Sequence, residues 1–211
     1  MPVAPLLEEL SAQVHAGPSG PLRLVLRPPA GADALAAFQA RMPLALTGSY
    51  PELLALSNGM SLYGIEVFGT EPPRDTNPEN VADLIRRRLV PFHDWGNGDF
   101  DCLDLTKVVD AEPPVVYWNE EHENIFPIAH SLLKWIPMAV HEVSRFGRLL
   151  HPEDYDDARY TDAQGVYESI ANVRKTFWGG PPIPDRLDDA PAATRKRDKL
   201  KQWFGARLRG R

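Results

Sequence analysis

The residues best suited to chemistry lie in one stretch, PFHDWGNGDFDCLDL at 91–105, which contains the chain's only cysteine. To act as a nucleophile, Cys102 would need a deprotonated thiol and a base, and His93 is the nearest candidate base across a predicted turn. However, Cys102 alternates with Phe100 along a predicted strand and therefore falls on an apolar face. We interpret Cys102 as a buried structural thiol.

Three aspartates form a ladder in the same stretch. With a period of two residues, Asp104 shares the face of Cys102, whereas Asp99 and Asp101 lie on the opposite face with two leucines. Either the strand bends near Leu103, or Asp104 is a buried structural acid that accepts hydrogen bonds from backbone N–H groups. Asp99 and Asp101 are closer to the turn, and we predict that they belong to a surface contacted by a partner.

A second acidic group, NEEHEN at 119–124, follows a short predicted strand. These carboxylates and the imidazole could hold a metal ion with Asp99 or Asp101, but consecutive carboxylates in a loop are more commonly a solvated patch. We therefore expect no metal and no cofactor. Two tryptophans nearby would be core residues if buried and interface anchors if exposed. The predicted partner-binding residues are Trp95, Asp99, Asp101, Trp118, Glu120, Glu121 and Glu123.

Sequence motifs of common enzyme classes are not found. The chain lacks a Gly-x-Ser-x-Gly elbow, a Walker loop and a Gly-x-Gly-x-x-Gly before a helix, and His141-Glu142 lacks the second histidine of a zinc-protease motif. Because no motif joins a nucleophile, a base and an orienting group, we expect a protein that is not an enzyme.

The composition is typical of a globular protein outside the membrane. Of 211 residues, 43% are hydrophobic, and no apolar run reaches the roughly 18 residues of a membrane span. The N-terminus does not have the pattern of a secretory signal, and one cysteine cannot form an intrachain disulfide. We expect a cytoplasmic protein.

The formal charge of −6 is unevenly distributed. Residues 1–150 contain 11 basic and 19 acidic residues, a net charge of −8, whereas 193–211 contain eight basic residues and one acid, a net charge of +7. An acidic body argues against direct nucleic-acid binding by residues 1–150. The basic end is either an exposed tail, an amphipathic helix that contacts a partner, a membrane or nucleic acid, or a segment that folds back onto the acidic body.

Helical spacing of apolar residues predicts helices over 4–16, 32–42, 44–56, 78–88, 128–146 and 160–177. Gly48 and Pro51 weaken the third helix, which is expected to kink or to begin late. Pro137 is expected to kink the fifth helix or to divide it in two. Arg86-Arg87-Arg88 complement the dipole at the C-terminal end of the fourth helix, so we do not assign them a phosphate-binding role.

Alternating patterns predict strands over 22–26, 61–68, 99–105 and 115–118. Gly96-Asn97-Gly98 separates two strand-like segments, and the Asn-Gly pair predicts a hairpin with a two-residue type I′ turn. Short turns between successive strands favour antiparallel pairing, so the predicted class is α+β. We expect an antiparallel or mixed twisted sheet with helices packed on one face, plus a helical C-terminal extension. The predicted divisions are an α+β domain at 1–150, a helical extension at 151–178, and a linker with a basic amphipathic segment at 179–211.

Several of these segments together resemble the SUKH superfamily. The run LLALSNG at 53–59, followed by a strand that ends VFGT at 67–70, is similar to one hallmark of that family. Pro91-Phe92, Gly96–Asp99, Cys102–Asp104, Pro114–Trp118 and a helix with Leu132, Leu133 and Trp135 resemble a second hallmark. The resemblance covers about 30–147 and implies a twisted α+β domain, with no catalytic residues to carry over.

The resemblance also implies a function, because the superfamily includes fungal cell-wall-synthesis regulators and many bacterial toxin-immunity proteins. We expect a non-enzymatic protein-binding module that neutralises a bacterial toxin. The alternative is an intracellular regulatory or scaffold protein of the same fold. An acidic face would suit a toxin with an electropositive active site, such as a nuclease.

Overall fold

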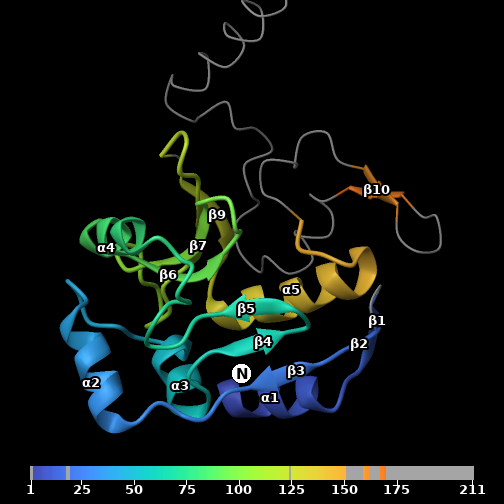
Figure 1. Cartoon of the computed structure of the whole chain (residues 1–211), viewed down its shortest axis with the longest axis horizontal. Coiled ribbons are helices and arrows are strands. Elements are labelled where there is room, and N and C mark those ends of the chain that lie inside the picture. Colours follow the sequence, from blue (N-terminus) through green and yellow to red (C-terminus); the bar gives the residue numbers. More distant parts are fainter. Residues whose placement is uncertain (1, 18–19, 124, 151–158, 162–166, 170–211) are drawn as a thin grey trace, which may run out of the picture. The chain divides into compact units, whose positions relative to one another are not determined.

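The computed structural model describes residues 2–17, 20–123, 125–150, 159–161 and 167–169 (Figure 1). All of these residues belong to one unit that spans 1–181. The described part combines five helices with antiparallel sheets, so the predicted α+β class is confirmed. Within it, no helix has the length and apolar character needed to cross a membrane.

Three helices precede the main strands. They are α1 (Val3–Ser11), α2 (Ala32–Ala40) and α3 (Ser49–Leu56). In α1, Val3, Leu6, Leu7 and Leu10 are buried at helical spacing, which explains why this segment folds as an amphipathic helix. The predicted helix over 4–16 is too long, because strand β1 (His15–Gly17) begins there and pairs with β2 (Gly20–Leu22). Helix α3 begins late, at Ser49, as expected for a segment that contains Gly48.

Residues 61–68 were predicted to form one strand, and this prediction is wrong. They contribute to a hairpin of β4 (Met60–Leu62) and β5 (Ile65–Val67), and β3 (Leu24–Leu26) pairs with the other side of β4. The two turn residues, Tyr63 and Gly64, have φ of 54° and 92°. A two-residue loop with both φ values positive has the backbone of a type I′ turn.

The larger sheet has the order β6-β7-β8-β9 with antiparallel neighbours. Its strands are β6 (Leu89–Asp94), β7 (Phe100–Asp104), β8 (Val115–Trp118) and β9 (Ile125–Ala129). The β3-β4-β5 sheet adjoins it at β6, where Phe68 N donates to Phe92 O at 2.7 Å and His93 Nδ1 lies 3.0 Å from Glu66 O. The ring of His93 therefore helps to join the two sheets.

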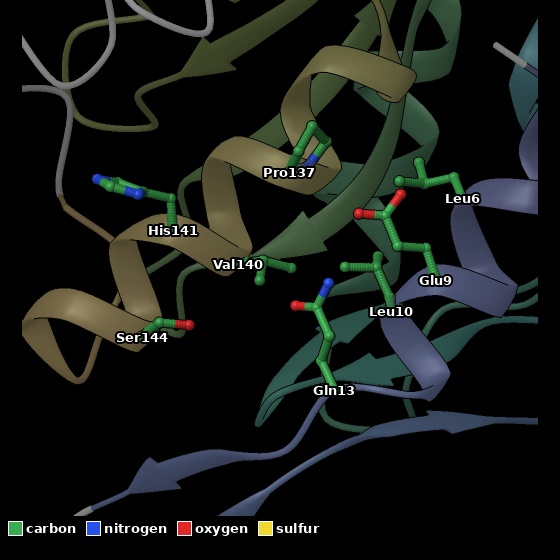
Figure 2. Close-up of a pocket in the computed structure, with 8 residues that line it drawn as sticks. All are labelled: Leu6, Glu9, Leu10, Gln13, Pro137, Val140, His141 and Ser144. Carbon is green, nitrogen blue, oxygen red and sulfur yellow. The ribbon is translucent and has the colours of Figure 1, made fainter.

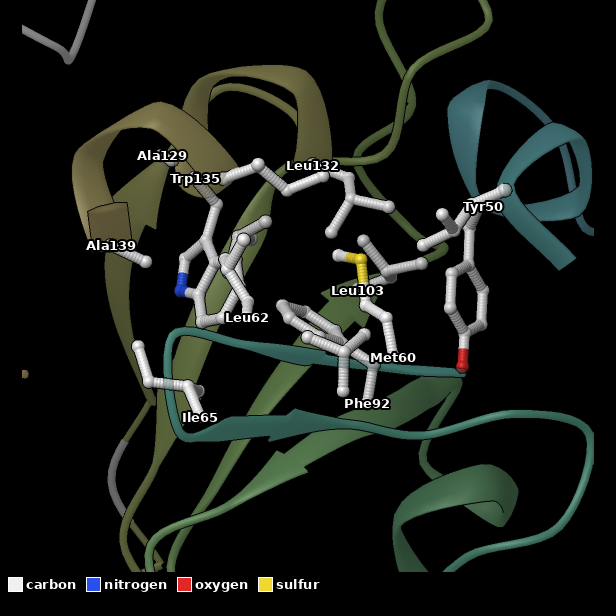
Figure 3. Close-up of a cluster of buried hydrophobic side chains, with 14 of the residues drawn as sticks. Tyr50, Met60, Leu62, Ile65, Phe92, Leu103, Ala129, Leu132, Trp135 and Ala139 are labelled. Carbon is white, nitrogen blue, oxygen red and sulfur yellow. The ribbon is translucent and has the colours of Figure 1, made fainter. Parts of the chain in front are cut away.

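The larger sheet is covered on both faces. Leu103 and Val115 pack into the main core with Trp135 of α5 (Leu132–Phe146). Figure 3 shows Leu103, Phe92 and Trp135 in this cluster. On the other face, Phe100 and Cys102 pack with Leu84 of α4 (Pro78–Arg86). We expected helices on one face of the sheet, but α5 covers one face and α4 covers the other. The apolar stripe of α4 is buried by this packing.

The predicted helix over 128–146 begins later than expected. Residues 125–129 form the edge strand β9, which contains Pro127, and α5 begins at Leu132. Proline is tolerated at a sheet edge because it lacks a backbone N–H to donate. Helix α5 continues through Pro137, so the proline does not divide it.

The C-terminal prediction is wrong where it can be compared. A helix was expected over 160–177, but β10 (Arg159–Thr161) and β11 (Tyr167–Ser169) form an antiparallel pair. Both strands contain tyrosine, and β10 also contains threonine, which are residue types that favour strands. The linker and the basic amphipathic segment predicted at 179–211 lie outside the described residues.

Candidate partner-binding surface

The loop that connects β6 and β7 comprises residues 95–99, so the hairpin prediction is confirmed but the two-residue turn is wrong. Gly96 and Gly98 have positive φ, whereas Asn97 does not. Side chains shape the loop instead: Asp94 Oδ1 accepts from Gly96 N at 2.7 Å, and Asn97 Oδ1 accepts from Asp99 N at 3.2 Å. These are the local turns that Asp and Asn side chains form with the backbone two residues on.

Asp101 is completely buried. Its carboxylate accepts hydrogen bonds from two indoles, Trp95 Nε1 at 3.0 Å and Trp135 Nε1 at 3.1 Å. His93 packs against both rings, with centroid distances of 5.4 and 5.9 Å. The carboxylate thus joins the β6–β7 loop to α5.

Asp99 is also buried and holds two loops together. Its Oδ2 accepts from Tyr117 Oη and, at 2.7 Å, from Asn97 Nδ2, while Oδ1 accepts from Glu120 N at 2.8 Å. Asn119 Nδ2 lies 3.4 Å from the same carboxylate. We predicted Asp99 and Asp101 on a surface contacted by a partner, but the structure buries both side chains, and their carboxylates hold the fold together from below the surface.

Asp104 is buried, as predicted for a structural acid. Its Oδ1 accepts from the backbone N of Thr106 at 2.9 Å, and Lys107 Nζ lies 3.3 Å from its Oδ2. Burial and the carboxylates of Asp101 and Asp104 raise the pKa of the Cys102 thiol well above its ordinary value. A protonated, buried thiol is a poor nucleophile, which agrees with the structural interpretation of Cys102.

The acidic loop between β8 and β9 is attached to α4. Glu120 Oε1 accepts from Asn80 Nδ2 at 2.8 Å, and Glu123 Oε2 accepts from Arg87 Nη1 at 2.9 Å. Glu121 is 83% exposed, and its carboxylate lies 3.9 Å from His122 Nε2. A Cβ at position 98 would overlap Glu120 Oε2, so Gly98 allows the two loops to approach. The loop is therefore a supported, acidic surface.

The two tryptophans lie in different environments. Trp95 is half-buried, and its ring packs edge-on against Tyr117 at 6.0 Å. Trp118 is 5% exposed and stacks on Phe100, so it is a core residue. Its Nε1 is buried without a hydrogen-bond partner.

Of the seven residues predicted to bind a partner, four are accessible, and three of these lie in one loop. The exposed residues are Glu120, Glu121 and Glu123, and Trp95 is partly accessible. Sequence analysis missed the donors that fix this surface, namely Asn80, Asn97, Tyr117, Asn119 and Trp135. Asn97 lies two residues before Asp99 beside two glycines, and Asn119 follows directly on a predicted strand. Asparagine at such positions is typical of turns, which is the only sequence signal for these two donors.

A separate groove of about 440 Å³ lies between α1 and α5. Leu10 and Val140 line its apolar part, and Glu9, His141 and Ser144 are among its polar residues (Figure 2). In Figure 2 the His141 ring and the Ser144 hydroxyl point in different directions, and the His141 ring points away from α1. This arrangement does not present Ser144 and His141 to each other as a nucleophile and its base.

These features define an α+β domain in which buried carboxylates support the exposed loops. A family model described as the SMI1 / KNR4 family (SUKH-1) matches residues 29–138, more than half of the sequence. The chain therefore belongs to the SMI1/KNR4 family (SUKH-1), and the resemblance inferred from the sequence is confirmed. A comparison with curated proteins gave no match.

Proposed function

We propose that this chain is a non-enzymatic protein-binding module and that it neutralises a cognate bacterial toxin in the cytoplasm. The observation that carries the proposal is the β8–β9 loop, where Glu120, Glu121 and Glu123 are exposed on a supported backbone. A surface that is already ordered loses little conformational entropy when it binds.

The charge of this surface suggests the chemistry of the toxin. Clustered carboxylates attract a partner with a basic surface and accelerate association. An enzyme that acts on nucleic acid has such a surface at its active site. An acidic loop that covers the active site would also exclude the substrate.

The test uses any toxin domain that is found encoded beside the gene, with growth rescue and calorimetric titration as readouts. Changing Glu121→Gln with Glu123→Gln should weaken binding about tenfold, mostly through slower association, and should flatten its dependence on salt. The matched control is Glu8→Gln with Asp33→Asn, which removes the same charge from exposed positions on α1 and α2. Equal binding by both double variants would overturn the proposed surface.

The second candidate is an intracellular regulator or scaffold, which the family description SMI1 / KNR4 favours because the superfamily includes fungal regulators. The same experiment separates the two candidates. If the chain gives no growth protection and no heat of binding with the adjacent toxin domain, toxin neutralisation is rejected and the regulator is retained.

A further inference from the structure

Strand β3 forms an open edge of the smaller sheet, at a place separate from the acidic β8–β9 loop. It is last in the order β3-β4-β5 and pairs with β4 alone. Strand β1 does not continue the ladder, because its pairing with β2 ends at His15 and Leu22, before β3 begins. Among the strands that the structure describes, none pairs with the outer side of β3.

The outer side of β3 carries unpaired backbone groups. Alternate residues of an antiparallel strand direct their N–H and C=O groups to opposite sides. Arg23 O accepts from the β4–β5 turn at 3.3 Å and Arg27 N donates to Gly59 O at 3.3 Å, so the odd-numbered residues face β4. Leu24 and Leu26 therefore direct N–H and C=O outward, and in the described part of the chain these four groups have no hydrogen-bond partner.

The side chains at this edge are apolar and accessible. Val25 is 58% exposed and Leu26 is 41% exposed. Leu26 lies opposite Met60, which is fully buried, so the exposure of Leu26 comes from the open edge and not from its face of the sheet. Edge strands that are protected against pairing commonly place a charge at such a central position. Strand β3 has valine there, so an added strand would cover apolar side chains as well as pair the backbone.

Two arginines flank the apolar centre. Because side chains alternate along a strand, Arg23, Val25 and Arg27 share one face. The guanidinium of Arg27 is paired with Glu66, whereas Arg23 is exposed and has no ion pair with any residue that the structure describes. Opposite charges on adjacent strands stabilise a sheet, so Arg23 favours a neighbouring strand with a carboxylate opposite it.

A second copy of β3 does not fit this edge. Antiparallel pairing centred on Val25 would place Arg23 of each copy opposite Arg27 of the other, and like charges directly opposite destabilise a strand pair. The arginines thus protect the edge against self-pairing, as charged side chains do on other edge strands. They leave the edge open to a strand of opposite charge.

We propose that β3 binds an extended, acidic segment of a partner protein by strand addition. Main-chain hydrogen bonds to Leu24 and Leu26 supply affinity, and the side chains that alternate along the segment supply specificity. An apolar residue of the segment packs on Val25, and a carboxylate faces Arg23. This contact goes beyond toxin neutralisation through the acidic loop, because an acidic strand and a basic surface are different partner chemistries.

The test titrates the full chain with the peptide Ser-Glu-Ile-Val-Ile-Glu-Ser, blocked at both ends, while amide hydrogen exchange is followed by NMR. The expected result is saturable binding that slows exchange at Leu24 and Leu26 about tenfold or more. Exchange at Val25, whose N–H faces β4, should change little. No saturable binding up to about 1 mM peptide would overturn the proposal. Protection of the same two amides that rises with protein concentration, without peptide, would also overturn it, since a second copy would then occupy the edge.

Charge variants test the side-chain contact. Arg23→Glu should weaken peptide binding about tenfold or more and should change its dependence on salt. The matched control is Arg74→Glu, which makes the same charge change at an exposed position between β5 and α4 and should leave binding unchanged. Equal losses in the two variants would contradict a contact at Arg23.

Backbone variants test the strand pairing itself. Leu26→Pro removes an outward N–H without removing a hydrogen bond between β3 and β4, so it should abolish binding at an unchanged melting temperature. A peptide that is N-methylated at both isoleucines lacks the N–H groups that pair with β3 and should not bind the wild-type chain. If this peptide binds as tightly as the unmodified one, the segment does not add to β3 as a strand.

Discussion

Asp99 and Asp101 show how a single carboxylate can connect elements that are distant in the sequence. Each has two oxygens that accept hydrogen bonds from several directions. Asp99 uses them to hold the β6–β7 and β8–β9 loops, and Asp101 uses them to hold two indole N–H groups. A cluster of aspartates near a turn can therefore serve the fold alone, even where its composition suggests a binding site.

The role of Asp101 predicts a large loss of stability when its oxygens are removed. Asp101→Ala removes the acceptor of the buried Trp135 indole N–H and of the part-buried Trp95 indole N–H, and it should lower the free energy of unfolding by about 3–4 kcal/mol. Asp101→Asn keeps one acceptor oxygen and should cost about 1–2 kcal/mol. Urea denaturation followed by tryptophan fluorescence measures both values.

The control for this prediction is Glu121→Ala, which removes an exposed carboxylate from the same end of the sheet. Its cost should stay within about 0.5 kcal/mol. If Asp101→Ala costs no more than Glu121→Ala, the indole hydrogen bonds do not stabilise the fold.

At the scale of elements, the hairpin β4–β5 depends on its turn. Tyr63 takes a left-handed conformation although it is not glycine, and its hydroxyl donates to Leu10 O at 2.9 Å. That hydrogen bond ties the turn to α1 and offsets the cost of the conformation. The following residue, Gly64, has φ of 92° and open space around the position of a Cβ.

Gly64 therefore separates conformational strain from steric overlap. Gly64→Ala should lower the free energy of unfolding by about 1–2 kcal/mol, because an L-residue is disfavoured at this φ. Gly64→Asn should cost less, since asparagine tolerates the left-handed region better. Thermal unfolding of the wild type and the two variants provides the comparison. If both variants melt at the wild-type temperature, the turn does not require positive φ at position 64.

The same turn explains which elements the sequence could and could not predict. Helix α4 was predictable because Asn77 caps it and Pro78 occupies its first turn. The alternation in 61–68 continues through Tyr63-Gly64, so nothing in the pattern marked the reversal of the chain. In contrast, Asn97-Gly98 has the composition of a type I′ turn but lies in a longer loop, because Asp94 and Asn97 side chains supply other hydrogen bonds.

Side-chain partners of the candidate surface were less predictable still. The burial of Asp99 and Asp101 depends on donors far away in the sequence: Tyr117 is 18 residues from Asp99, and Trp135 is 34 residues from Asp101. Periodicity assigns a residue to a face of a strand and does not reveal whether a distant donor covers it. Glu120, Glu121 and Glu123 were predictable as exposed because consecutive charges rarely pack in a core.

At the scale of the whole molecule, proton binding couples several buried groups to folding. Burial raises the pKa of Cys102 well above its ordinary value, and it also raises the pKa of Tyr50 and Tyr63. These groups bind their protons more tightly in the folded chain than in the unfolded chain. Below the pKa values of the unfolded chain both states are protonated, so the contribution to stability is fully present there.

Stability should consequently fall in alkaline solution. Above about pH 9 the Cys102 thiol ionises in the unfolded chain but stays protonated in the fold, and above about pH 10 the same applies to Tyr50. The unfolded state then binds fewer protons, so the free energy of unfolding decreases as pH rises. Urea denaturation at a series of pH values from 7 to about 11 gives the curve.

Cys102→Ala separates the thiol from the tyrosines. It lowers stability at every pH because it removes a buried sulfur, but its decline should begin near pH 10 and not near pH 9. In the native wild-type chain the thiol should also resist alkylation by iodoacetamide at pH 8, because alkylation requires a thiolate and access. Two outcomes would contradict this prediction. Parallel stability curves for wild type and Cys102→Ala between pH 8 and 10 would show that the thiol does not couple proton binding to folding. Rapid alkylation of the native chain would show that Cys102 is accessible.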